Sequence, residues 1–223
     1  MNTGVRRNEA AMRLHLGSIP EIADLPAEDG WVKLREPPLW VVRWVLALPL
    51  SLVLALLSAV LVIRYTEITP QGLNGGGLLA VYVATIAIHE LVHAAIHPDR
   101  GLSERTVLGL WPSRLVFFAH YEGARSKGNF TLGMIAPFLV LTILPLIAAH
   151  QFGWSSWILG AVIILNASAS SVDVIGFFIA LFGLPDSSIV QNRGWHSYWR
   201  SAARSISSNK PLQPIARDDA RSG

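Results

Sequence analysis

Four long apolar stretches dominate the pattern of hydrophobic and polar positions along the chain. They cover residues 39–63, 78–96, 130–149 and 157–184, and the segments between them carry most of the charge. A helix needs about 20 mostly apolar residues to cross the hydrocarbon core of a bilayer, so each stretch is close to or above the required length. The pattern therefore predicts an all-α membrane protein with four transmembrane helices.

Composition supports this prediction. Of the 223 residues, 52% are hydrophobic and only 15% are charged, whereas soluble domains carry about 25% charged residues. Charged side chains are scarce inside a bilayer because placing them there costs free energy. The net charge of +3 comes from basic residues beside the apolar stretches rather than from a separate basic domain, which argues against a nucleic-acid partner.

Lys and Arg are distributed unevenly between the segments that join the stretches. Segments 1–38, 97–129 and 185–223 are rich in both, whereas the opposite side would hold only Arg64, and residues 150–156 contain neither. Cytoplasmic segments of membrane proteins carry an excess of Lys and Arg. Both termini are therefore predicted to be cytoplasmic, in a multi-pass protein of a bacterial cell membrane.

The predicted organisation has three parts. A cytoplasmic N-terminal arm (1–38) precedes a four-span membrane domain (39–184), and a cytoplasmic C-terminal segment (185–223) follows it. The end of that segment is rich in polar residues and proline, which is typical of a disordered tail. Aromatic residues just upstream, at positions 195, 198 and 199, predict an anchoring stretch at the membrane interface.

A short β-hairpin is predicted in the cytoplasmic loop between the second and third helices. Residues 106–121 read TVLGLWPSRLVFFAHY, with two β-rich runs on either side of Trp111-Pro112-Ser113. An exposed hairpin edge could bind an extended peptide by strand addition. The alternative is a hairpin that only caps the helical bundle.

The second apolar stretch carries the residues that indicate chemistry. It reads AVYVATIAIHELVHAAIH, in which His89 and His93 are four residues apart and lie on one helix face. Two imidazoles so placed can bind one metal ion, and the chain has no cysteine to offer instead. Glu90 lies about 100° around the helix, beside the open coordination position. There it can take a proton from a zinc-bound water.

A catalytic zinc ion needs a third protein ligand, and Asp173 is the leading candidate. It is the only Asp or Glu inside another apolar stretch, and the predicted orientation places it at a depth similar to that of the two histidines. Asn166 and Ser170 precede it at positions that share its helix face, so they are expected to support the site. His97 is the rival ligand because it shares a face with His89 and His93, although the following proline disfavours helical geometry there.

Other polar residues are weaker candidates. A hydrogen-bonded polar cluster that ties helices together is the alternative to a metal site. Glu104 and His120 are minor rivals for the third ligand position. The remaining histidines are expected to be ordinary surface or interfacial residues: His15, His150 and His196.

With HExxH in one membrane helix and Asn166 to Asp173 in a later one, the chain resembles two related groups. It is distantly similar to intramembrane metalloproteases of the site-2 protease type. It more closely resembles a family of small four-span bacterial membrane proteins called putative zincin peptidases, including the pair Ala136-Pro137. The resemblance implies His89, His93 and Asp173 as zinc ligands and Glu90 as catalytic base. Unlike the site-2 protease motif, the segment from Asn166 reads NASASSVDVIG, without proline.

Two functions from different classes follow from these observations. The first is a zinc-dependent metallopeptidase embedded in the membrane, which cleaves a peptide or membrane-protein substrate near the cytoplasmic face. The second is a non-hydrolytic membrane protein that binds or transports a cation. In a peptidase Glu90 is an unligated base, whereas in a binding site it could itself be a ligand.

Overall fold

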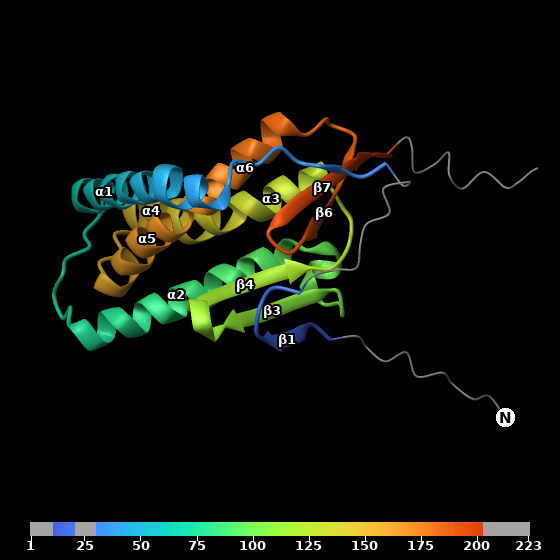
Figure 1. Ribbon diagram of the computed structural model, residues 1–223. Helices are drawn as coiled ribbons and strands as arrows, with labels where there is room; N and C mark the ends of the chain where they lie inside the picture. Colours follow the sequence, from blue (N-terminus) through green and yellow to red (C-terminus); the bar gives the residue numbers. More distant parts are fainter. Residues whose placement is uncertain (1–10, 21–29, 203–223) are drawn as a thin grey trace, which may run out of the picture.

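The structure, a computed structural model, describes residues 11–20 and 30–202. Helices make up most of it, and two small β-sheets lie near one end of the helical bundle (Figure 1). In chain order the helices are α1 (Leu48–Tyr65), α2 (Gly75–Ile96), α3 (Lys127–Phe138), α4 (Leu144–Phe152), α5 (Trp157–Ala169) and α6 (Ser171–Gly183). A π-helical segment, Val41–Ala47, leads into α1, and another, Leu139–Ile143, joins α3 to α4.

Local sequence explains where the helices begin and end. The side chain of Asn74 caps α2 by accepting the N–H of Gly77 at 2.8 Å, and Ser126 caps α3 in the same way. α2 ends before His97, whose ψ of 156° is extended, as expected for a residue before proline. α4 ends at Gly153, whose φ of 64° suits glycine.

The helices fall on the four predicted apolar stretches. Among the described residues, three helices are long and apolar enough to cross a membrane: Trp44–Tyr65, Gly75–Ile96 and Lys127–Phe152. The fourth stretch is not a single straight helix, because α5 and α6 meet at Ser170 with a bend of 49°. They make a fourth span if the bent pair crosses as one.

The first sheet contains the predicted hairpin. β3 (Thr106–Trp111) pairs antiparallel with β4 (Val116–Tyr121), in a register that runs from Thr106 opposite Tyr121 to Trp111 opposite Val116. β1 (Arg13–Leu16) adds to the other side of β3 in parallel. The strand order β1-β3-β4 leaves β4 as an edge strand, and that strand packs against α2.

The second sheet was not predicted from the sequence. Its order is β2-β7-β6-β5, formed by β2 (Val32–Lys33), β5 (Arg125–Ser126), β6 (Ser188–Arg193) and β7 (His196–Ser201), with every pair antiparallel. The aromatic stretch predicted as an interfacial anchor therefore lies in the β6–β7 hairpin. The predicted disordered tail, after about residue 205, lies outside the described residues.

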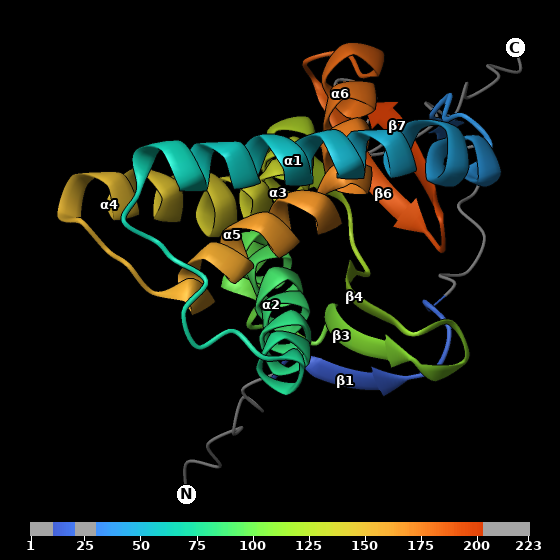
Figure 2. The same cartoon turned by 90° about the vertical axis from the view of Figure 1, so that its left-hand side faces the viewer.

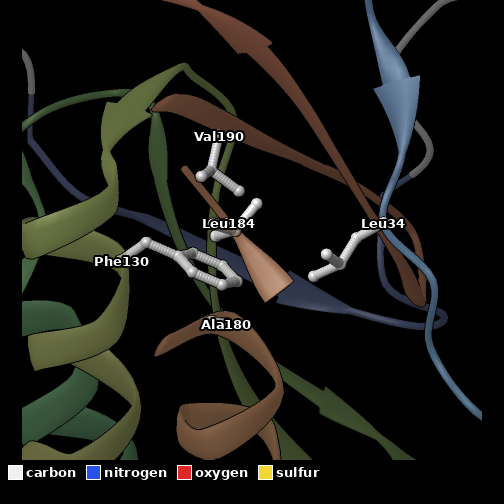
Figure 3. Packing of buried hydrophobic residues seen from close by; sticks show 5 residues of the cluster. All are labelled: Leu34, Phe130, Ala180, Leu184 and Val190. Carbon is white, nitrogen blue, oxygen red and sulfur yellow. The ribbon is translucent and has the colours of Figure 1, made fainter. Parts of the chain in front are cut away.

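A compact apolar core joins the second sheet to the helices. Phe130 of α3, Ala180 of α6 and Leu34 of the N-terminal arm pack with Leu184 and Val190 (Figure 3). Each of these side chains is at most 5% exposed. The core thus fixes α3 and α6, the helices on either side of the candidate site, relative to the arm and to β6.

Candidate metal centre

The residues singled out in the sequence converge between three helices. His89, Glu90 and His93 lie in the C-terminal half of α2, and Asp173 lies in the first turn of α6. Asn166 lies in α5, one turn before the break at Ser170. Contacts of α2 with α3 and α5 bring the elements together, so residues 77 to 84 positions apart meet at one point.

Three possible ligand atoms lie close enough to one another to bind a single metal ion. Asp173 Oδ2 is 3.0 Å from His89 Nε2 and 3.5 Å from His93 Nε2, and the two Nε2 atoms are 3.1 Å apart. In a tetrahedral site with metal–ligand bonds of about 2.0–2.1 Å, neighbouring ligand atoms are roughly 3.3–3.4 Å apart. The three separations therefore suit a single small metal ion.

The outer nitrogens of both imidazoles are already hydrogen-bonded. His93 Nδ1 donates to the backbone carbonyl of Gly133, and His89 Nδ1 donates to Asn166 Oδ1, both at 2.8 Å. We assign the proton of each ring to Nδ1 because both partners are oxygen acceptors. Each Nε2 then carries a lone pair that faces the site.

Asn166 is held in the orientation that this assignment requires. Its Nδ2 donates to the carbonyl of Pro137 at 2.9 Å and to Thr142 Oγ1 at 3.0 Å, with Ser170 Oγ at 3.4 Å. Both Asn166 and Ser170 are fully buried. The amide oxygen is thus left to accept from His89.

The donor set fits a zinc ion. The Nε2 lone pairs of His89 and His93 and the carboxylate oxygen of Asp173 lie within 3.5 Å of one another. These electron-rich atoms repel one another unless a cation lies between them. Two imidazoles and a carboxylate are a known ligand set for catalytic zinc. The hydrogen bonds from Nδ1 are the kind that orient histidine ligands in such sites.

Glu90 lies next to these atoms. His89, Glu90 and His93 form a group whose possible ligand atoms all lie within 4.8 Å of one another. Glu90 Oε2 accepts the backbone N–H of Ala119 in β4 at 2.7 Å. Strand β4 therefore fixes one carboxylate oxygen of Glu90 beside the imidazoles.

The rival ligands have other surroundings, although His97 also lines the cavity beside the site. His97 is buried against Tyr121, with ring centroids 5.3 Å apart, and its Nδ1 lies 3.4 Å from Thr106 Oγ1. Burial, together with the nearby positive charge of Arg125, lowers the pKa of His97 to about 3. His120 is also buried and also outside the metal group. Glu104 does not belong to the group either.

The three histidines expected to be ordinary have local partners. His15 Nε2 donates to the carbonyl of Ser18, His150 Nδ1 lies 2.7 Å from the carbonyl of Tyr65, and His196 faces Glu36 at 3.7 Å. None of them belongs to the group of His89, Glu90 and His93.

The group borders a cavity of about 420 Å³. Residues 115–119, from the turn before β4 and from β4 itself, line this cavity together with Trp195 and Ile19. A larger cavity of about 620 Å³ shares Asp173, Val116 and Trp195 among its lining residues, so the two cavities adjoin. The group and β4 therefore line one cavity.

Two contacts of the site were missed from the sequence. No local sequence pattern predicts the hydrogen bond from the N–H of Ala119 to Glu90, because this bond depends on how β4 packs on α2. The carbonyl of Gly133 does have a local signal: Pro137, four residues later, lacks the N–H that would normally bond to it.

These features define a helical protein with apolar helices long enough to cross a membrane and a possible metal site on an HExxH helix. Residues 82–189 match the protein-family model described as "Putative zincin peptidase". The match supports the family resemblance recognised from the sequence. No curated protein and no solved structure matches the chain.

Proposed function

We propose that the protein is a zinc-dependent metallopeptidase of the cell membrane. His89, His93 and Asp173 would hold the ion, and Glu90 would be the catalytic base. The observation that carries the proposal is the convergence of Asp173 Oδ2 and two imidazole Nε2 atoms, with the carboxylate of Glu90 beside them. When bound there, zinc would polarise a water molecule and the substrate carbonyl.

Glu90 performs the proton transfers in this proposal. Its carboxylate accepts a proton from the attacking water and passes it to the leaving amine. The hydrogen bond from Ala119 orients the carboxylate through one oxygen and leaves the other available for the proton. Asn166 and Gly133 hold the two imidazoles in the tautomer that faces the ion.

The edge of β4 that faces away from β3 is the proposed substrate-binding element. Ala119 directs its N–H to Glu90 and therefore away from β3. A peptide that pairs with this edge would place its backbone next to Glu90, in the cavity that β4 lines. The substrate class is thus an extended peptide or an unwound segment of a membrane protein, since a helix shields its peptide bonds.

The decisive experiment compares zinc content and peptide cleavage in wild type, Glu90→Gln and Glu67→Gln. Glu67 is exposed in the loop between α1 and α2 and controls for the loss of one carboxylate. We expect Glu90→Gln to keep about one zinc per chain and to lose cleavage by about 10²–10⁴-fold. Cleavage at the wild-type rate by Glu90→Gln would refute the proposed base.

The ligand set is tested by the same zinc measurement. His89→Ala and His93→Ala should each abolish binding, and Asp173→Ala should weaken it strongly, because each removes one of three ligands. His97→Ala should leave binding unchanged. Zinc loss in His97→Ala with normal binding in Asp173→Ala would reverse the assignment of the third ligand.

One observation favours a second function, a membrane protein that binds or transports a cation without hydrolysis. The carboxylate of Glu90 is close enough to both imidazoles to be a ligand itself. In that case Glu90→Gln would lose zinc while the protein stays folded. Retention of zinc with loss of cleavage selects the peptidase.

A further inference from the structure

The helix that faces the HExxH motif has a proline in its interior. Pro137 lies near the end of α3, where a residue would normally donate its N–H to the carbonyl four positions earlier. Proline has no N–H, so the carbonyl of Gly133 loses its regular helical partner. A buried carbonyl without a partner is unfavourable, and the structure supplies another donor.

That donor is a proposed metal ligand. His93 Nδ1 lies 2.8 Å from the Gly133 carbonyl oxygen. The bond commits the ring proton to Nδ1 and turns Nε2 toward Asp173 and His89. The carbonyl oxygen that lacks a helical donor because of Pro137 is therefore the same oxygen that orients His93.

The other histidine depends on the same stretch of helix. Just after Pro137 the helix widens into the π-helical segment Leu139–Ile143. The Pro137 carbonyl and Thr142 Oγ1 both accept from Asn166 Nδ2, which leaves Asn166 Oδ1 for His89. One irregular stretch of helix thus orients both imidazoles, directly for His93 and through Asn166 for His89.

We propose that Pro137 is a positioning residue of the metal centre: its missing N–H reserves the Gly133 carbonyl for His93 and so fixes the tautomer that binds zinc. The inference rests on the proposed zinc site. It adds a role for a residue that touches neither the ion nor the substrate. Pro145 lies in the same helical span, in the first turn of α4, and its missing N–H affects the carbonyl of Leu141 rather than that of Gly133.

The test compares Pro137→Ala with the matched control Pro145→Ala. Alanine at 137 supplies an N–H that competes with His93 for the Gly133 carbonyl. We expect the zinc Kd, measured by competition with a chromophoric chelator, to rise about 10–100-fold, as for other lost partners of histidine ligands. Pro145→Ala should keep the wild-type Kd.

A second readout separates positioning from general damage to the helix. Alanine favours helix far more than proline, so the zinc-free Pro137→Ala protein should be at least as thermally stable as zinc-free wild type. ¹⁵N NMR of histidine-labelled, zinc-free wild type should show the proton of His93 on Nδ1. This measurement needs no variant and remains informative if Pro137→Ala fails to fold.

The outcomes distinguish this inference from the proposed function. A wild-type Kd for Pro137→Ala, or a His93 proton on Nε2 in the wild type, overturns the inference and leaves the peptidase proposal standing. Zinc binding without any cleavage overturns the peptidase proposal and leaves the role of Pro137 standing. Failure of wild type to bind zinc removes both.

Discussion

At the residue scale, the two nitrogens of each imidazole have different environments. Each Nδ1 is bonded to an oxygen acceptor, and each Nε2 faces the other ring and Asp173. The spacing of His89 and His93 was sufficient to predict that they share a helix face. The acceptors were not predicted, because the sequence does not reveal which atoms of α3 and α5 pack against α2.

The sequence predicted that Asn166, Ser170 and Asp173 line one face of a single helix, and the structure differs in the course of that helix. Spacings of four and seven residues placed them on one face of a continuous helix. In the structure the helix breaks at Ser170, and Asp173 begins the next one. The carboxylate still reaches both imidazoles, because a bend at Ser170 does not remove Asp173 from the side that faces α2.

Removing the amide of Asn166 should weaken zinc binding more than removing the hydroxyl of Ser170. Asn166→Ala deletes the acceptor of His89 and should raise the zinc Kd about 10–100-fold. Ser170→Ala deletes only the longest of the contacts that Asn166 makes, at 3.4 Å, and should change Kd by less than about threefold. Chelator competition measures both, and equal effects would contradict the proposed role of Asn166.

The lowered pKa of the buried His120 predicts that the folded protein loses stability in acid. Burial and the positive charges of Arg125 and Arg13 lower its pKa to about 4. Between about pH 6.5 and 4 the unfolded chain therefore binds a proton that the folded chain does not. Stability contributed by neutral His120 is complete above pH 6.5 and falls by up to about 1.4 kcal/mol for each pH unit below it.

Unfolding of zinc-free protein in detergent at pH 7 and pH 5 measures this effect without any contribution from metal release. His120→Gln should show a smaller difference in stability between the two pH values than wild type. An identical difference in both proteins would show that His120 does not titrate as its surroundings indicate.

At the element scale, the structure shows which strands carry a local signal. β3 and β4 are each six residues long, rich in β-forming residues and separated by a turn, so the hairpin was predicted. β2 and β5 have two residues each and owe their strand conformation to partners far along the chain. β1 pairs with β3 across more than ninety residues, and no local pattern predicts that.

The contact between β4 and α2 predicts the effect of removing one backbone N–H. Ala119→Pro deletes the donor to Glu90, and proline is tolerated on an edge strand when the lost N–H points away from the sheet. Zinc content should stay at the wild-type level, and the rate of peptide cleavage should fall about tenfold, the equivalent of one hydrogen bond. Ala119→Ser keeps the N–H and is the matched control. Loss of activity in both variants would locate the effect in the side chain.

At the scale of the whole molecule, the two sheets join segments that lie far apart in the sequence. Figures 1 and 2 show both sheets near the same end of the helices, away from the loops that follow α1 and α4. α1 presents many large apolar side chains, with Leu52 60% and Leu56 58% exposed. An exposed apolar helix surface of this extent fits contact with lipid.

Hydrogen bonding between the strands restricts the membrane topology. The second sheet joins β2 before α1, β5 between α2 and α3, and the β6–β7 hairpin after α6. Strands that share hydrogen bonds must lie on one side of a membrane. The chain must therefore cross the membrane an even number of times between any two of these segments. Between β5 and β6 lie the helix Lys127–Phe152 and the α5–α6 pair, so an even number supports counting that bent pair as one span. The same three segments hold the excess of Lys and Arg, so the strand pairing and the charge distribution both group these segments on one side.

This topology is tested with a reporter that is active only outside the cytoplasm. Fusion after Gly75, in the segment between α1 and α2, should give a signal, because that segment lies across the membrane from both sheets. Fusions after Ser126 and at the C-terminus should give none, because the positive-inside rule places the basic segments in the cytoplasm. A cytoplasmic reporter at the same three positions should give the reverse pattern and controls for expression. A strong external signal from the C-terminus alone would mean that α5 and α6 do not cross as one span, and it would conflict with the pairing of β2 with β7.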